Sequence, residues 1–353
     1  MKIHNFCAGP SILPDEVFKQ ASEAVKDLNG SGLSLLEISH RSNAFVDIMD
    51  ESCDLALELL DLKRSDYTPL FLQGGASMQF LMTAYNFLRN EAAFLNTGTW
   101  SKKAIKEAEL FGNVDVLGTS ENDNFNHIPK FNISKEYDYF HCTSNNTIFG
   151  TQINNFPETN VPIFCDMSSD IFSRKLNFSK FDLIYAGAQK NLGPAGATLV
   201  IIKNELLNNI KDDVPSMMNY KIQADKSSMF NTPPVFSVYV SMLNMRWLKK
   251  MGGISEIEKN NRKKAEILYS EVDINPLFTG HSIEKDRSIM NATFNLTDDN
   301  FKETFESMLA EAKITALSGH RSVGGYRASM YNAMSLDSVK TLVEVMSELE
   351  TKI

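Results

Sequence analysis

The sequence predicts an α/β protein with a mainly parallel sheet, on two observations. Short apolar runs alternate with helical segments over roughly the first 235 residues of the 353-residue chain. Strands that alternate with helices form parallel sheets covered on both faces. After about residue 235 the alternation gives way to longer helices. We expect a large domain over residues 1–250 and a small C-terminal α/β domain over residues 251–353, with segment 1–15 a candidate to pack on the small one.

The elements follow from local signals. Pro14 and the glycines at 30 and 32 bound a helix over 14–27, and apolar residues at helical spacing predict another over 44–60. An apolar run over 69–73 predicts a strand, and a helix follows it to about residue 88. The other strands of the first half, all expected to be buried, cover 92–96, 114–117, 137–142, 162–165, 182–186 and 197–203. The C-terminal part is expected to hold helices over 235–251, 255–272, 299–312 and 335–351, and strands over 288–296 and 326–331.

Composition excludes several classes of protein. No stretch approaches the roughly 18 apolar residues that span a bilayer, and no apolar run follows Lys2 as in a secretory signal. Four scattered cysteines fit neither a disulfide framework nor a zinc site, so we expect a cytoplasmic protein without a metal. The net charge of −9 disfavours nucleic acid as a partner.

Lys190 is the first candidate for chemistry. It lies in a loop of small residues, AGAQKNLGPAG at 186–196, directly after an apolar run. A lysine in a tight, partly desolvated loop has a lowered pKa, which suits Schiff-base formation. A surface lysine in a glycine-rich turn is the alternative.

Three further features support the Schiff-base interpretation. The sequence Gly-Gly-Ala-Ser at 74–77, between a strand and a helix, predicts an anion-binding turn, although an ordinary βα turn is as good an interpretation of it alone. Asp166 ends a strand, where a carboxylate can hold a pyridine nitrogen protonated or cap the following turn. Trp100 opens a helix, where it can stack on a heterocycle or belong to the core. Together with the lysine, these groups are what pyridoxal 5′-phosphate requires.

Two His-Arg pairs indicate an anionic substrate. They are His40-Arg41 and His320-Arg321, and Arg327 follows the second pair after a glycine-rich loop. Arginine binds carboxylate and phosphate groups in a bidentate manner. We therefore expect a substrate with at least two anionic groups, against the alternative of scattered surface arginines.

With these motifs together, the sequence resembles the phosphoserine aminotransferase family, within the class-V, fold-type-I pyridoxal-phosphate aminotransferases. The resemblance runs nearly from end to end. Its motifs are NFCAGP at 5–10, SHRS at 39–42, LQGGAS at 72–77, TGTWS at 97–101, DMSS at 166–169, GAQKN at 187–191, NTPP at 231–234, GHRSVGG at 319–325 and RAS at 327–329.

The resemblance implies a large domain with a seven-stranded-type sheet, pyridoxal 5′-phosphate as cofactor and a homodimer with shared active sites. It also implies ping-pong transfer of an amino group from L-glutamate to 3-phosphohydroxypyruvate in serine biosynthesis, and leaves open the 4-phosphohydroxy-L-threonine step of vitamin B6 synthesis. The implied roles are as follows: Lys190 for the Schiff base, Asp166 for the pyridinium nitrogen, Trp100 for stacking, Thr147 for the ring 3′-oxygen, Ala76, Ser77 and Gln189 with a partner subunit's Asn231 and Thr232 for the phosphate, Arg327 for the α-carboxylate, and His40, Arg41, His320 and Arg321 for the distal anion.

Three alternatives stay open at this point. An alanine–glyoxylate type aminotransferase of the same class would not need so many distal cations. A cysteine desulfurase needs a cysteine in the C-terminal part of the chain, and none lies beyond Cys165. A non-catalytic scaffold would have no use for Lys190 and Asp166.

Overall fold

The centre of the molecule is a seven-stranded sheet in the computed structural model, which describes residues 3–321 and 323–352. Six of its strands run in one direction, and β10 alone is antiparallel to both of its neighbours. The predicted α/β class with a mainly parallel sheet is therefore confirmed. In spatial order the strands are β2 (Tyr67–Leu72), β10 (Thr198–Lys203), β9 (Leu183–Gly187), β8 (Ile163–Asp166), β5 (Phe140–Thr143), β3 (Glu91–Asn96) and β4 (Asn113–Thr119).

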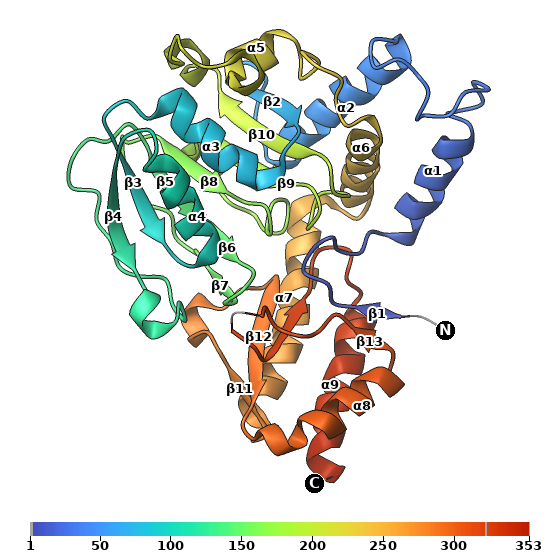
Figure 1. Ribbon diagram of the computed structural model, residues 1–353. Coiled ribbons are helices and arrows are strands. Elements are labelled where there is room, and N and C mark those ends of the chain that lie inside the picture. Colours follow the sequence, from blue (N-terminus) through green and yellow to red (C-terminus); the bar gives the residue numbers. More distant parts are fainter. Residues whose placement is uncertain (1–2, 322, 353) are drawn as a thin grey trace.

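Helices cover both faces of this sheet (Figure 1). Each face buries its own hydrophobic cluster, as expected for a parallel sheet between two layers of helices. One face packs against α3 (Gly75–Phe87), α4 (Thr99–Ala108) and α5 (Tyr220–Asp225), and the other against α1 (Asp15–Lys26), α2 (Asn43–Leu59) and α6 (Val235–Lys250).

The C-terminal part has its own core around a three-stranded antiparallel sheet, seen in the lower part of Figure 1. Residues near the N-terminus join it, because β1 (His4–Asn5) pairs with β13 (Ile314–Thr315) and Phe6 is fully buried in this core. The division of the chain at residue 250 stays a prediction. The elements are α7 (Gly253–Ile274), α8 (Lys302–Glu311), α9 (Leu336–Lys352), β11 (Phe278–Gly280), β12 (Asn291–Leu296) and β14 (Tyr326–Ser329).

One prediction about the strands was wrong. The run at 114–117 was expected to be buried, but it belongs to β4, which is an edge strand with exposed residues such as Val116. β4 is the last strand of the sheet and pairs with β3 alone, so the apolar residues in it do not indicate that the strand is buried. The sequence also gave no signal for strands of two or three residues, namely β1, β6 (Asn145–Asn146), β7 (Thr151–Gln152), β11 and β13.

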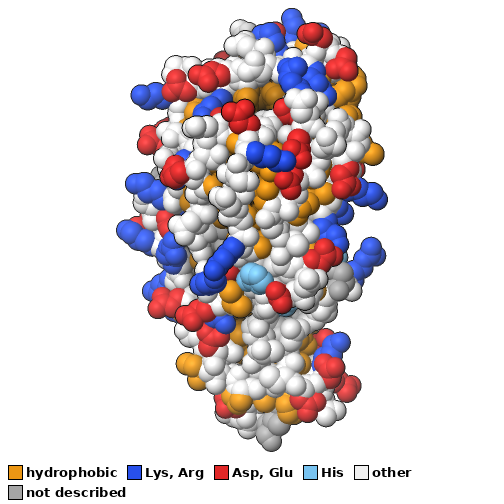
Figure 2. Space-filling view, turned by 90° about the vertical axis from the view of Figure 1, so that its left-hand side faces the viewer, with side chains coloured by type: hydrophobic (Ala, Val, Ile, Leu, Met, Phe, Trp, Pro, Cys, Tyr) orange, Lys and Arg blue, Asp and Glu red, His pale blue; other side chains and the backbone are white. Residues whose placement is uncertain are grey.

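The surface carries charges of both signs. On the side shown in Figure 2, Lys and Arg side chains are interspersed with Asp and Glu side chains. None of the helices in the described part of the chain is long and apolar enough to span a membrane.

Candidate active site

A cavity of about 320 Å³ opens where the carboxyl ends of several strands meet. Because β2, β3, β8 and β9 point the same way, the loops that follow them converge at one edge of the sheet. Nine predicted site residues line this cavity: Ala76, Ser77, Trp100, Thr147, Asp166, Gln189, Lys190, His320 and Arg327.

The turn between β2 and α3 forms one wall of the cavity. Gly74 precedes the helix with a φ of 94°, and a Cβ on it would lie 2.5 Å from the Cβ of Met78. Glycine is therefore required there by both conformation and space. The first turn of α3 presents backbone N–H groups, with Ala76 and the hydroxyl of Ser77 on the cavity. Such a helix N-terminus binds a phosphate.

Trp100 forms a second wall. Its indole Nε1 donates a hydrogen bond to Thr147 Oγ1 at 3.1 Å, and its ring centre lies 5.4 Å from the Lys190 Nζ. The turn that carries it is tight, because a Cβ on Gly98 would lie 2.0 Å from the Asn146 side chain. The indole therefore lines the cavity and also packs against two hydrophobic clusters, so its stacking role stays a prediction.

Asp166 is the last residue of β8 and is 5 % exposed. Its Oδ1 accepts hydrogen bonds from Ser168 N at 2.9 Å and Ser168 Oγ at 2.6 Å. Its Oδ2 has no hydrogen bond from any described residue. Burial raises the pKa of Asp166, while the charge of Lys190 and the Ser168 hydrogen bonds act in the opposite direction. One carboxylate oxygen thus caps the turn, and the other is left for a cation.

Lys190 follows β9 by three residues. Its turn is held from the N-terminal segment, where Ser11 N donates to Gln189 O at 2.9 Å and Ser11 Oγ donates to Lys190 O. Burial lowers the pKa of Lys190, Arg327 acts in the same direction, and Asp166 opposes them. A lowered pKa favours the neutral amine, which is the nucleophile in Schiff-base formation.

The cavity has a cationic end. Arg327, on β14, donates a hydrogen bond from Nη1 to Thr147 O at 3.3 Å. His320 also lines the cavity, and its pKa is lowered by burial and by the charges of Arg327, Arg321 and Lys103. These groups place positive charge on the wall of the cavity, which suits an anionic substrate.

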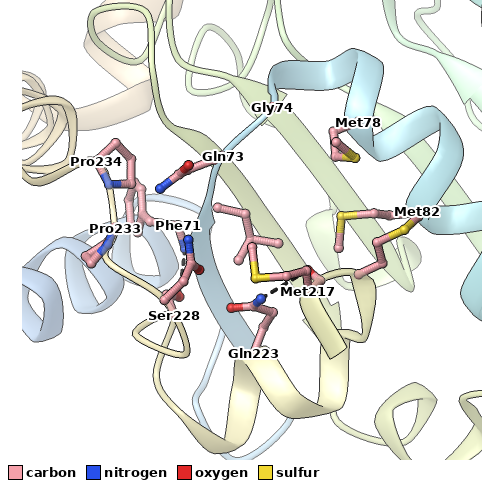
Figure 3. Close-up of a pocket in the computed structure, with 13 residues that line it drawn as sticks. Phe71, Gln73, Gly74, Met78, Met82, Met217, Gln223, Ser228, Pro233 and Pro234 are labelled. Atoms are coloured by element: carbon pink, nitrogen blue, oxygen red, sulfur yellow. Dashed lines mark hydrogen bonds between the residues drawn. The ribbon is translucent and has the colours of Figure 1, made fainter. Parts of the chain in front are cut away.

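Five predicted residues do not line the cavity. Arg41 and Arg321 are exposed, and His40 lies before α2 with its Nε2 buried and without a hydrogen-bond partner among the described residues. Asn231 lines a separate pocket of about 260 Å³, in which Figure 3 shows Gln73 and Gly74 beside Pro233 and Pro234. Thr232 is tied to the same wall, since Gln73 Nε2 donates to Thr232 O at 2.7 Å. Ser322 of the predicted loop lies outside the described residues.

Several contacts were not predicted. Ala8, Gly9, Phe80, Ile148 and Ser168 also line the cavity, as does Gly75 of the predicted anion-binding turn. For Ser168 the signal was present, because a serine two residues after a strand-ending aspartate can donate to it. In the described part of the chain, no group of three or more His, Cys, Asp or Glu residues could hold a metal ion.

Comparison with known proteins agrees with this geometry. The family described as Aminotransferase class-V matches residues 3–342. A phosphoserine aminotransferase of Flavobacterium psychrophilum is 60 % identical over the full length of both chains, and that of Bacteroides fragilis is 48 % identical over 99 % of both. The chain belongs to the phosphoserine aminotransferase family of class V.

Solved structures of this family superimpose closely. A phosphoserine aminotransferase from Bacillus circulans subsp. alkalophilus has a TM-score of 0.96 at 38 % identity and covers 99 % of both chains. The enzyme from Trichomonas vaginalis, solved with PLP bound, has a TM-score of 0.93 at 33 % identity, over 98 % of this chain and all of the other. An alanine–glyoxylate aminotransferase from Nostoc sp. is 13 % identical with a TM-score of 0.75, and so shares the fold. The predicted fold type is confirmed by these similarities.

Proposed function

We propose that this chain is a pyridoxal-phosphate-dependent transaminase that converts L-glutamate and 3-phosphohydroxypyruvate to 2-oxoglutarate and O-phospho-L-serine. The observation that carries the proposal is the convergence of Lys190, Asp166, Trp100 and the turn at 74–77 on one cavity. Relatives at 48–60 % identity over the full length bear the name phosphoserine aminotransferase.

The residues of the cavity fit pyridoxal 5′-phosphate. The Oδ2 of buried Asp166, which no described residue engages, suits a protonated ring nitrogen, and the Trp100 face suits an aromatic ring. The phosphate would take the N–H groups of Ala76 and Ser77, the Ser77 hydroxyl and Gln189, and the Thr147 hydroxyl would reach the ring 3′-oxygen. When bound, this cofactor supplies an aldehyde that condenses with amines and a ring that delocalises electrons.

Residues of the protein would transfer the proton and bind the substrate. The lowered pKa of Lys190 favours its neutral amine, and its Nζ would take the proton from Cα of the bound L-glutamate. Arg327 holds the α-carboxylate in a bidentate manner. His320, which lines the cavity, would bind the distal anion, which is a carboxylate in glutamate and a phosphate in the keto acid. The family resemblance assigns Arg321, His40 and Arg41 to the same anion, although none of these three lines the cavity of its own subunit. One cationic site can therefore serve both substrates.

We also propose a homodimer with shared active sites. Asn231 and Thr232 do not line the cavity of their own subunit: Asn231 lines the separate pocket beside Gln73, and Gln73 Nε2 donates to Thr232 O. The pocket that Asn231 lines also has apolar, accessible side chains: Met78 is 38 % exposed and Met217 is 52 % exposed (Figure 3). A second copy seated on this face would cover them and receive Asn231 and Thr232 at its own phosphate site. We further propose a cytoplasmic location, which the four free thiols support.

Two experiments test the activity. A coupled assay with L-glutamate should give much higher kcat/KM for 3-phosphohydroxypyruvate than for hydroxypyruvate or glyoxylate, because only the phosphorylated acid uses the distal cations. Preference for glyoxylate would favour the alanine–glyoxylate alternative. Borohydride reduction of the holoenzyme followed by peptide mapping should place the reduced cofactor on Lys190, and an adduct elsewhere would contradict the proposal.

A further inference from the structure

Two of the three residues that follow the Arg327 strand connect it to other parts of the site, the cavity wall at Ala8 and the turn that carries Lys190. Tyr331 donates a hydrogen bond from its hydroxyl to Ala8 O at 2.8 Å, and Ala8 lines the cavity. The backbone N–H of Asn332 donates to Asn191 Oδ1 at 2.9 Å, and Asn191 directly follows Lys190. Residues 330–332 therefore connect Arg327 to the Ala8 wall and to the Lys190 turn.

Two side chains of helix α7 hold residues 330–332 by hydrogen bonds. The Nζ of Lys264 donates to three backbone carbonyls, those of Met330 at 2.9 Å, Tyr331 at 2.8 Å and Met334 at 3.1 Å. One turn earlier on the helix, Asn261 Nδ2 donates to Asn332 Oδ1 at 2.8 Å. Both side chains are almost completely buried. Because the lysine holds backbone atoms, it restrains the path of the segment itself.

Further hydrogen bonds hold Asn191 and Asn332 beside the Lys190 turn. Asn191 Nδ2 donates to Ile171 O at 2.5 Å, and Asn332 Nδ2 donates to Phe172 O at 3.0 Å. Both carbonyls belong to the turns that follow Asp166. A further amide, Asn244 Nδ2, donates to Asn191 O and to Leu192 O. Arg327, Lys190 and the turns after Asp166 are thus connected by buried hydrogen bonds between elements far apart in the sequence.

We propose that Tyr331 and Asn332 are positioning residues, which hold Arg327 in a fixed relation to Lys190 and to the Ala8 wall. The proposal rests on the proposed function, in which Arg327 takes the α-carboxylate and Lys190 takes the Cα proton. The α-carboxylate of the substrate is bonded directly to Cα. The distance between the Arg327 and Lys190 side chains therefore decides whether Cα lies within reach of the Lys190 Nζ. Misplacement of about 1 Å at such a site lowers the rate substantially.

Tyr331→Phe tests the Ala8 contact, with Tyr269→Phe as a matched control. Both tyrosines are buried in the C-terminal part and donate to one backbone carbonyl, Tyr269 to Ser288 O at 3.0 Å, but Tyr269 does not line the cavity, and its hydroxyl donates outside residues 330–332. We expect Tyr331→Phe to raise the KM for L-glutamate about two- to tenfold, the worth of one hydrogen bond. The control should lower the melting temperature comparably and leave KM unchanged.

Asn332→Ala removes the side-chain hydrogen bonds with Phe172 O and Asn261, which hold the segment beside the Lys190 turn, and keeps the backbone bond to Asn191. Asn275→Ala is its control. Asn275 is also buried, and its Nδ2 donates to Met346 O at 3.1 Å, away from the cavity. We expect Asn332→Ala, and not the control, to lower kcat and to shift the pH midpoint of the absorbance of bound pyridoxal phosphate. If neither Tyr331→Phe nor Asn332→Ala differs from its control in KM, kcat or this midpoint, the two residues have only a structural role and the inference is wrong. A wild-type protein that neither binds the cofactor nor transaminates would instead contradict the proposed function.

Discussion

The Nζ of Lys190 lies 5.4 Å from the centre of the Trp100 ring. The two residues come from different loops, one after β9 and one at the start of α4, and the space beside them is bounded by Asp166 and the turn at 74–77. A planar ring placed against the indole would present an aldehyde to the amine.

Trp100→Ala should weaken the binding of pyridoxal phosphate to the apo-protein roughly tenfold, because stacking contributes about 0.5–1.5 kcal/mol beyond buried area. Trp100→Phe should retain part of the affinity. The Kd would be measured by absorbance titration. Trp247, the other tryptophan, lies in α6 and Trp247→Phe should bind the cofactor like the wild type. Equal Kd values for Trp100→Ala and wild type would exclude stacking.

Asp166→Asn should lower kcat on the order of 10²–10³-fold, the usual cost of removing one preorganised electrostatic partner. An amide of the same shape keeps the hydrogen bonds of the turn but cannot hold a ring nitrogen protonated. Steady-state kinetics with L-glutamate would measure the loss. If the variant retained kcat within about twofold, the carboxylate would serve only as a cap of the turn.

Ser168→Ala should move the acidic limb of the rate profile to higher pH. Ser168 Oγ donates to Asp166 Oδ1 at 2.6 Å and so lowers the pKa of that carboxyl. Without it the pKa rises, and Asp166 becomes protonated at a pH where the wild type is still ionised. The measurement is kcat/KM as a function of pH. Ser169→Ala is the control, since Ser169 Oγ donates to Asn145 O and makes no hydrogen bond with Asp166; identical profiles for the two variants would refute the assignment.

The sequence was sufficient to predict the positions of the site residues that lie at or just after the ends of strands. Asp166 ends a strand, and Lys190 and Trp100 each follow one. In a parallel sheet the carboxyl ends of the strands lie at the same edge. Local sequence patterns therefore predicted that these three residues, far apart in the sequence, lie close together. The Ser11 contact with the Lys190 turn could not be found this way, because 179 residues separate the pair and no local spacing encodes it.

The same limit applies to the C-terminal contacts. The pairing of β1 with β13 joins two-residue strands about 310 residues apart, and such short strands carry no periodicity. Lys264 follows five polar residues at 259–263, a run typical of an exposed helix face, yet it is buried. Only the tertiary structure shows that backbone carbonyls satisfy its charge.

Lys264 should make stability depend on pH in a defined direction. Burial lowers its pKa from the usual 10.5 to about 7 in the folded protein. Between these values the unfolded chain binds more protons than the folded one, so the free energy of unfolding rises with pH, by about 1.4 kcal/mol per unit for this group. The cost of burying the charge is complete below pH 7 and disappears towards pH 10.5. From about pH 7 to about pH 9.5 the wild type should therefore gain roughly 3 kcal/mol relative to Lys264→Met, measured by urea denaturation. Lys263→Met, at the exposed neighbouring position, should follow the wild-type curve, and parallel curves for wild type and Lys264→Met would show that Lys264 keeps an ordinary pKa.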